Sequence, residues 1–177
     1  MKKYFFGLAL AAMLTSCLGD DNKLDDYSEW MQKNIDYITK TEADPQFVKV
    51  TPVWDQASFT LMKWHKRGPA ENKLIPMSNS TIAIKYLTKT IEGDTIDSSY
   101  SQTQWGDSLY VCKPNQMIVG FHIATTSMHV GDSVTAVVPY TCAYGIQGSG
   151  SVQPYSTLVF EIKLDSIVSL EGLPWRD

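Results

Sequence analysis

This chain of 177 residues has only three histidines, and their positions fit neither a metal site nor the activation of a nucleophile. His122 and His129 lie seven positions apart, and His65 is distant from both. A metal site needs several ligands close together, so we expect no metal centre and no other cofactor. Ser98 and Ser99 have no histidine placed to serve as their base, so we do not expect serine hydrolysis.

Two other polar residues are candidates for a functional site. Asp97 lies in the segment IDSS, which in isolation fits a turn or a helix cap. Tyr144 directly precedes Gly145 at the base of the glycine-rich loop CAYGIQGSGSVQP. A tyrosine at the base of such a loop has little role in folding, so Tyr144 is the more telling of the two.

The stretch from Met117 to Phe160 contains the elements that would surround a ligand. It opens with the apolar run MIVGFHIA, which predicts a short helix, and continues with VTAVVP, a β-branched strand that ends at a proline. The glycine-rich loop follows, and STLVFEIKLDSI then alternates apolar and polar residues with the strand period of two. We expect these elements to place aromatic and aliphatic side chains around one concavity.

The upstream part of the chain predicts one more helix and further strands. Residues 26–40 carry apolar side chains at helical spacing, with Ser28 as the candidate cap, which indicates a helix that packs on the domain. Alternating patterns predict strands within residues 45–54, 57–68 and 81–90. The fold class is therefore α+β: a curved antiparallel sheet of about five strands wrapped on a short helix, with an extra N-terminal helix.

The first residues predict a secretory leader. Two lysines precede an apolar run, Tyr4 to Leu14, that is too short to span a membrane, and small residues follow it. Cys17 comes next and resembles the lipidated cysteine of a bacterial lipoprotein; the alternative is an ordinary signal peptide with a chance cysteine. The expected organisation is a signal at 1–16, lipidated cysteine and linker at 17–26, a helix-and-strand extension at 27–73 and the main domain at 74–170.

A lipid at Cys17 would anchor the chain to the cell envelope without making it an integral membrane protein. Acidic residues soon after it resemble sorting signals for the outer membrane or cell surface, although a solvated linker explains them as well. Removing residues 1–16 leaves 13 basic and 19 acidic residues, a net charge of −6, which argues against nucleic acid as a partner. Cys112 and Cys142 remain, either as two buried thiols or, beyond the inner membrane, as a disulfide.

Between about Leu74 and Val168 the order and spacing of four segments resemble the domain of FKBP-type peptidyl-prolyl isomerases. The segments are STIAIKYLTKTIEGDTIDSS, MIVGFHIATTSMHVGDSVTAVVP, CAYGIQG and PYSTLVFEIKL. The resemblance implies an enzyme that isomerises X-Pro bonds in exported proteins and assists their folding. That reaction requires a dry pocket that grips the proline ring and prefers the twisted amide, without a nucleophile or a metal.

The resemblance also implies the residues of the site. Asp97 and Tyr144 would take the catalytic positions, with Asp97 near the twisting carbonyl and Tyr144 as a hydroxyl donor. The backbone N–H of Ile118 would bond to a substrate carbonyl, and residues 145–154 would form a flap. The substrate-binding residues would be Tyr86, Ile96, Tyr110, Met117, Ile118, Phe121, Val152 and Phe160. The implied partners are proline-containing polypeptides.

Several positions depart from the pattern of this family. Ile96 stands where a phenylalanine is typical, and Phe121 stands where a tryptophan is typical. An aromatic residue expected around Ser108 is absent, unless Trp105 or Leu109 takes its place. The flap has Ser151-Val152-Gln153 in place of larger aliphatic residues and a second proline, and it is one residue shorter.

The sequence also fits other interpretations. Outside the family pattern, Tyr86, Tyr110 and Phe160 fit ordinary positions in a sheet core. The departures support a second hypothesis, an FKBP-like peptide-binding or chaperone lipoprotein with weak or no isomerase activity. A third hypothesis is a structural surface lipoprotein whose N-terminal helix docks a partner.

Overall fold

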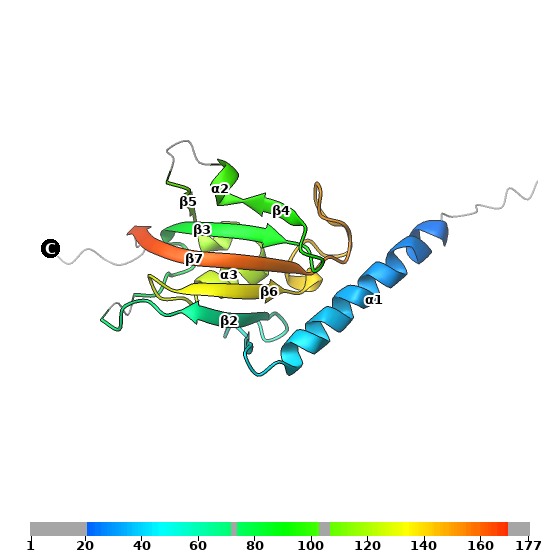
Figure 1. The fold of residues 1–177 in the computed structure, drawn as a ribbon, viewed down its shortest axis with the longest axis horizontal. Helices are drawn as coiled ribbons and strands as arrows, with labels where there is room; N and C mark the ends of the chain where they lie inside the picture. Colours follow the sequence, from blue (N-terminus) through cyan, green and yellow to red (C-terminus); the bar gives the residue numbers. More distant parts are fainter. Residues whose placement is uncertain (1–20, 72–73, 103–106, 170–177) are drawn as a thin grey trace, which may run out of the picture.

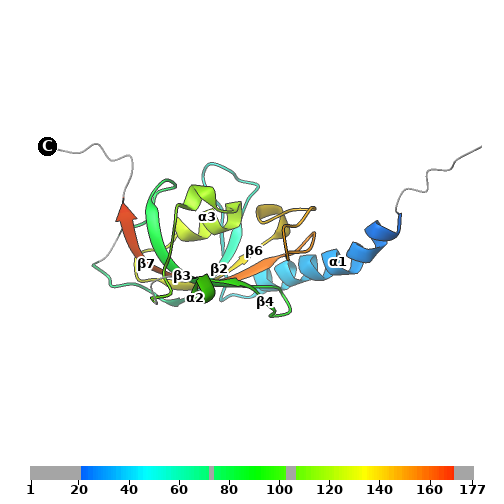
Figure 2. The same cartoon turned by 90° about the horizontal axis from the view of Figure 1, so that it is seen from above.

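One curved antiparallel sheet wraps the short helix α3 (Val119–Thr125), as Figures 1 and 2 show. The computed structural model describes residues 21–71, 74–102 and 107–169. The predicted leader and Cys17 therefore lie outside the described residues. No helix within these ranges combines the length and the apolarity needed to cross a membrane. The predicted α+β class is confirmed.

The sheet has seven strands, more than the five or so that we expected. They are β1 (Val48–Val50), β2 (Thr60–Lys66), β3 (Thr81–Lys89), β4 (Thr95–Ser98), β5 (Tyr110–Cys112), β6 (Ser133–Val138) and β7 (Leu158–Ser169). Their order is β1-β2-β6-β7-β3-β4, and β5 also pairs with β3. β1 lies within the strand predicted at 45–54, whereas β4 and β5 were not predicted. Strands of only four and three residues are too short to show a readable period in the sequence.

The two faces of the sheet carry different clusters, and the side chains of β7 alternate between them. Leu158 and Phe160 belong to the main core on the concave face, which covers α3. Val159 points the opposite way and joins a smaller cluster with Leu61 and Val137. This is the strand alternation predicted for STLVFEIKLDSI.

The N-terminal helix α1 (Asp21–Ala43) is longer than the predicted 26–40 at both ends. Ser28 consequently lies inside the helix and is not its cap. Tyr37 and Ile38 pack against the cluster on the outer face of the sheet, which confirms that the apolar stripe binds the domain. The N-terminal end of α1 extends beyond the sheet (Figure 1).

Close packing seats α3 against the sheet. A Cβ at Gly120 would lie 2.1 Å from Cγ1 of Val138 on β6, so glycine is required for this approach. The carbonyl of Gly120 accepts a 2.9 Å hydrogen bond from the buried Thr60 hydroxyl on β2. These contacts fix the position of the helix residues on either side of Gly120.

Three short helical turns complete the described fold: α2 (Ser99–Gln102), η1 (Pro114–Gln116) and η2 (Tyr140–Cys142). Cys112 and Cys142 are both buried and both free thiols, so the thiol alternative holds in this structure. Burial raises the pKa of the Cys112 thiol to about 11. The thiol is therefore protonated and poorly nucleophilic near neutral pH.

Candidate functional site

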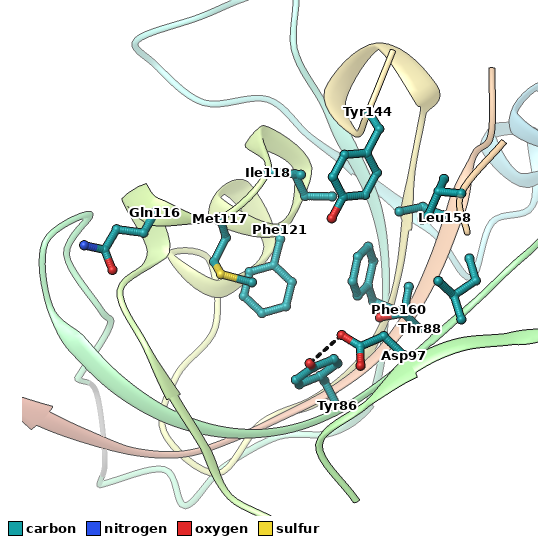
Figure 3. A pocket seen from close by; sticks show the side chains of 12 residues that line it. Tyr86, Thr88, Asp97, Gln116, Met117, Ile118, Phe121, Tyr144, Leu158 and Phe160 are labelled. Atoms are coloured by element: carbon teal, nitrogen blue, oxygen red, sulfur yellow. Dashed lines mark hydrogen bonds between the residues drawn. The ribbon is translucent and has the colours of Figure 1, made fainter. Parts of the chain in front are cut away.

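A cavity of about 320 Å³ lies between α3 and the concave face of the sheet (Figure 3). Its lining residues are Tyr86, Thr88, Ile96, Asp97, Gln116, Met117, Ile118, Phe121, Tyr144, Val152, Leu158 and Phe160. Asp97 is the one ionisable acid or base in this set besides the two tyrosines. A mostly apolar cavity of this size with a few polar groups is typical of a small-ligand site.

Three aromatic rings form much of the apolar wall. Phe121 on α3 meets Phe160 on β7 edge to face, with ring centroids 5.5 Å apart. Tyr86 on β3 approaches Phe121 in the same way at 6.4 Å. Each such pair adds about 0.5–1.5 kcal/mol beyond the burial of its surface. The rings therefore hold one another in place before a ligand enters.

A short hydrogen bond joins the two polar residues on the sheet side of the cavity. The Tyr86 hydroxyl donates to Oδ2 of Asp97 at 2.7 Å (Figure 3). The Oδ1 atom of Asp97 accepts the backbone N–H of Ser98 at 2.7 Å. Burial, followed by the interaction with Asp97, raises the pKa of Tyr86 far above its ordinary value. The phenol therefore remains a donor and fixes the orientation of the carboxylate.

The start of α3 supplies a backbone donor beside the cavity. Ile118 is the N-cap of α3, and its carbonyl accepts the N–H of His122 at 3.0 Å. No acceptor for the N–H of Ile118 is found among the described residues. Backbone N–H groups at the start of a helix have no partner within it. This donor is thus available to a carbonyl of a ligand.

The loop between β6 and β7 covers the opposite side with Tyr144 and Val152. The hydroxyl of Tyr144 points into the cavity (Figure 3), although the residue is 42% exposed. Ser149 and Val152 exchange two backbone hydrogen bonds of 3.0 and 2.8 Å, which hold the tip of the loop. A Cβ at Gly148 would lie 2.3 Å from the carbonyl oxygen of Val152, so this crossing of the backbone needs glycine. The loop is an ordered flap.

Nine of the ten predicted site side chains line the cavity, and Tyr110 does not. The ring of Tyr110, on β5, contacts the ring of Tyr86 edge to face, with centroids 5.4 Å apart. Tyr110 pairs with Ile84 on β3 and supports the lining residue Tyr86, and its predicted role in substrate binding stays a prediction. Ile96 lines the cavity as an aliphatic residue, whereas Ser108 lies outside it.

Three lining residues were not predicted: Thr88, Gln116 and Leu158. Two of them follow from the strand period, since Thr88 is two positions after Tyr86 and Leu158 is two positions before Phe160. Gln116 directly precedes the predicted Met117, but it belongs to η1, which no sequence pattern indicated. The predicted catalytic roles of Asp97 and Tyr144 stay predictions, and the predicted lipidation site lies outside the described residues.

Solved structures share the fold. A peptidyl-prolyl cis-trans isomerase from Pseudomonas syringae superposes with a TM-score of 0.66 and 22% identity, covering 80% of this chain and 95% of that one. FkpA from Escherichia coli superposes with a TM-score of 0.69 and 20% identity, covering 83% of this chain and 63% of that one. At these identities the likeness establishes the fold.

Sequence relatives carry the comparison further. The FKBP-type 22 kDa peptidyl-prolyl cis-trans isomerase of Escherichia coli is 35% identical over 95 residues, 53% of this chain and 44% of the relative. The macrophage infectivity potentiator of Trypanosoma cruzi is 31% identical over 96 residues, 54% of this chain and 47% of the relative. The chain thus spans less than half the length of these relatives.

A family model describes the same region. Residues 73–165, more than half of the chain, match the model of the FKBP-type peptidyl-prolyl cis-trans isomerase. The matched region contains every residue that lines the cavity. The chain therefore belongs to the family of FKBP-type peptidyl-prolyl cis-trans isomerases.

Proposed function

We propose that this chain is a peptidyl-prolyl cis-trans isomerase that acts on proline-containing segments of polypeptides. The observation that carries the proposal is the cavity, which combines a wall of aromatic rings with the carboxylate of Asp97 and the hydroxyl of Tyr144. Membership of the family supports the same activity. The lining contains no residue placed as an activated nucleophile, which suits a reaction that breaks no covalent bond.

The chemistry requires the pocket to prefer a twisted amide. Rotation about a peptide bond meets a barrier of about 18–20 kcal/mol because resonance is lost in the twisted state. A proline ring can pack on the apolar surface formed by Phe121, Phe160 and Leu158. A carbonyl held there leaves water, which disfavours the charge-separated planar amide relative to the twisted one. Each 1.4 kcal/mol of preference for the twisted state raises the rate about tenfold.

Three polar groups would orient the substrate. The N–H of Ile118 has no acceptor among the described residues and can receive a carbonyl of the chain. The hydroxyl of Tyr144 can donate to a second carbonyl from the flap side. Asp97, held by Tyr86, lies on the opposite side, where it would face the rotating carbonyl carbon. The groups bind the substrate at several points while the amide itself stays free to turn.

The test is an isomerisation assay with a short chromogenic X-Pro peptide and the folded chain. We expect acceleration over the uncatalysed rate that saturates with peptide and is competed by a second proline peptide. A matched control is Asp94→Ala, which changes an exposed carboxylate three positions from Asp97. A folded sample that gives no acceleration would rule out the proposed activity.

A second candidate function is a binding or chaperone module, which the aliphatic Ile96 favours because it offers less ring surface to a proline than phenylalanine. This module would bind unfolded chains with little catalysis. Ile96→Phe separates the two functions: for an isomerase weakened at this wall, the added ring increases kcat/KM. Unchanged catalysis together with undiminished binding of an unfolded protein would favour the binding module.

We propose further that the chain works in the cell envelope on exported proteins, anchored through lipidated Cys17. The short apolar run and the position of this cysteine support the proposal. Labelling of cells with a radioactive fatty acid tests it: the chain should take up label and sediment with membranes. Cys17→Ser should lose both properties, and label retained in that variant would refute the anchor.

A further inference from the structure

Helix α1 lies on the outer face of the sheet, directly behind the strand that forms part of the pocket. Tyr37 and Ile38 of α1 pack against a cluster that includes Val159 on β7. The two neighbours of Val159 in sequence, Leu158 and Phe160, point to the concave face and line the cavity. One layer of strand backbone therefore separates α1 from the pocket.

A buried asparagine makes the most specific contact between the helix and this strand. Asn34 is 0% exposed. Its Nδ2 donates to the carbonyl of Trp30 at 2.7 Å, and its Oδ1 accepts the backbone N–H of Thr157 at 2.7 Å. Asparagine is unfavourable inside a helix and costly to bury unless it is hydrogen-bonded. Asn34 thus ties α1 to the residue that directly precedes β7.

Two further residues of α1 contact the positions just before Thr157. Nε1 of Trp30 donates to the hydroxyl of the buried Ser156 at 3.1 Å. The ring of Tyr27 lies 6.5 Å from the ring of Tyr155. Tyr155 has a φ of +62°, a left-handed conformation that costs a non-glycine residue free energy. Contacts from α1 therefore hold three consecutive positions, the first of them in a strained conformation.

Tyr155 is also the residue that closes the base of the flap. Its N–H donates to the carbonyl of Gly145 at 3.0 Å, and the N–H of Gly145 donates to the carbonyl of Tyr140 at 2.9 Å. The rings of Tyr140 and Tyr155 meet edge to face at 5.5 Å. Tyr144, whose hydroxyl points into the cavity, directly precedes Gly145. A continuous series of contacts thus leads from α1 through Tyr155 and Gly145 to Tyr144, whose hydroxyl points into the cavity.

We propose that α1 positions the flap over the candidate pocket, with Asn34 and Trp30 as the positioning residues. Because the helix contacts positions 155–157, it fixes two neighbouring parts of the pocket wall. These are the base of the flap and the first residues of β7. The catalytic consequence rests on the proposed isomerase function, whereas the control of flap geometry does not. Neither positioning residue touches the cavity.

The test compares Asn34→Ala, Trp30→Phe and the control Ile38→Ala in the full chain. Ile38 lies on the same helix one turn further on and packs on the sheet, so its truncation weakens the docking of α1 without removing a bond to positions 155–157. Amide hydrogen exchange reports on the flap through the bonded N–H groups of Val152 and Tyr155. We expect these amides to exchange about five- to tenfold faster in the two positioning variants, the effect of losing one buried hydrogen bond.

Kinetics provide the second measurement. A loosened flap should raise KM for a short X-Pro peptide by a similar factor and leave kcat within about twofold, because binding contacts become less well placed. Trp30→Phe keeps an aromatic ring but removes the N–H donor and part of the ring surface, and it decides the outcome if Asn34→Ala does not fold. Flap exchange equal to that of the wild type, or to that of Ile38→Ala, would overturn the proposal. If the wild type shows no isomerase activity, the proposed function fails while the exchange result still decides whether α1 controls the flap.

Discussion

Two aspartates of this domain, Asp97 and Asp132, show how different surroundings give one side chain different roles. Asp132 is fully buried, in the loop that leads from α3 to β6. Its Oδ1 accepts the N–H of Gly68 at 2.7 Å, and its Oδ2 accepts Nε1 of Trp64 and the N–H of His129, both at 3.1 Å. Trp64 lies on β2 and Gly68 follows that strand, whereas His129 lies in the same loop as Asp132, so the carboxylate joins the end of β2 to this loop.

Asp97 lies at the edge of the cavity instead, where a ligand can reach it. The hydroxyl of Tyr86 and the N–H of Ser98 hold its two oxygens. These two partners come from the adjoining strand and from the next residue, and they orient the carboxylate at the edge of the cavity. Asp132 therefore stabilises the fold, whereas Asp97 lines the cavity.

The largest expected effect is on stability, at Asp132. Asp132→Ala leaves the donors of Gly68, Trp64 and His129 without their buried acceptor, so we expect a loss of about 3 kcal/mol or more in the free energy of unfolding. Urea denaturation measures it. The exposed control Asp94→Ala should change stability by less than about 0.5 kcal/mol. Equal losses in the two variants would show that Asp132 does not hold the loops together.

The complementary change at Asp97 should act on catalysis. Asp97→Ala is expected to lower kcat/KM for a short X-Pro peptide about tenfold, because the carboxylate no longer faces the rotating carbonyl. Stability should fall by only about 1–2 kcal/mol, because the bonds from the Tyr86 hydroxyl and the Ser98 N–H are lost at the edge of a cavity that water can enter. Asp97→Asn keeps the shape and tests the charge alone. Full activity in Asp97→Ala would remove this residue from the mechanism.

The sequence allowed one member of this pair to be predicted and not the other. Asp97 lies in a segment, IDSS, that resembles the family, so its place at the site followed from order and spacing. Asp132 lies in the turn MHVGD, and nothing local distinguishes it, because its partners Trp64 and Gly68 are more than sixty positions upstream. Polar contacts between residues that are distant in the chain produce no periodic pattern, so they cannot be predicted from the sequence.

The same distinction applies to the fold. The period of two predicted β3 and β7, and the apolar run predicted α3, since each buries one regular face. The helix α1 and its packing on the domain were predicted, but its contacts with positions 155–157 were not. Nothing in the sequence distinguishes Asn34 from other polar helix residues, because its partner Thr157 is distant in the chain. The resemblance placed Tyr110 in the wall of the pocket, whereas in the structure its ring contacts the lining residue Tyr86 and is not itself among the lining residues.

A smaller effect on catalysis is expected at Tyr144, across the cavity from Asp97. Tyr144→Phe removes one hydroxyl and keeps the ring, so kcat/KM should fall about three- to fivefold while stability stays the same. Tyr100→Phe is the matched control, because Tyr100 is 61% exposed and does not line the cavity. The isomerase assay with both variants makes the comparison. A loss shared by the control would place the cause outside the pocket.

The smallest expected effect is a change with alkaline pH in the free energy of unfolding. It concerns Tyr86, the donor that orients Asp97. Burial, and then the neighbouring Asp97, raises the pKa of Tyr86 far above the value of about 10 expected in the unfolded chain. Above about pH 10 the unfolded state therefore releases the proton while the native state keeps it, so the free energy of unfolding falls as pH rises. Tyr86→Phe lacks this titration. It should cost about 1 kcal/mol near pH 8.

The difference between Tyr86→Phe and the wild type should consequently narrow between about pH 8 and pH 10.5, because only the wild type pays for keeping this phenol protonated. Urea denaturation at the two pH values measures the narrowing, and Tyr100→Phe should lose stability in parallel with the wild type. If Tyr86→Phe also runs parallel to the wild type, the phenol ionises as easily in the folded protein as in the unfolded chain. The hydrogen bond to Asp97 would then be too weak to orient the carboxylate, and the distinction between the two aspartates would rest on burial alone.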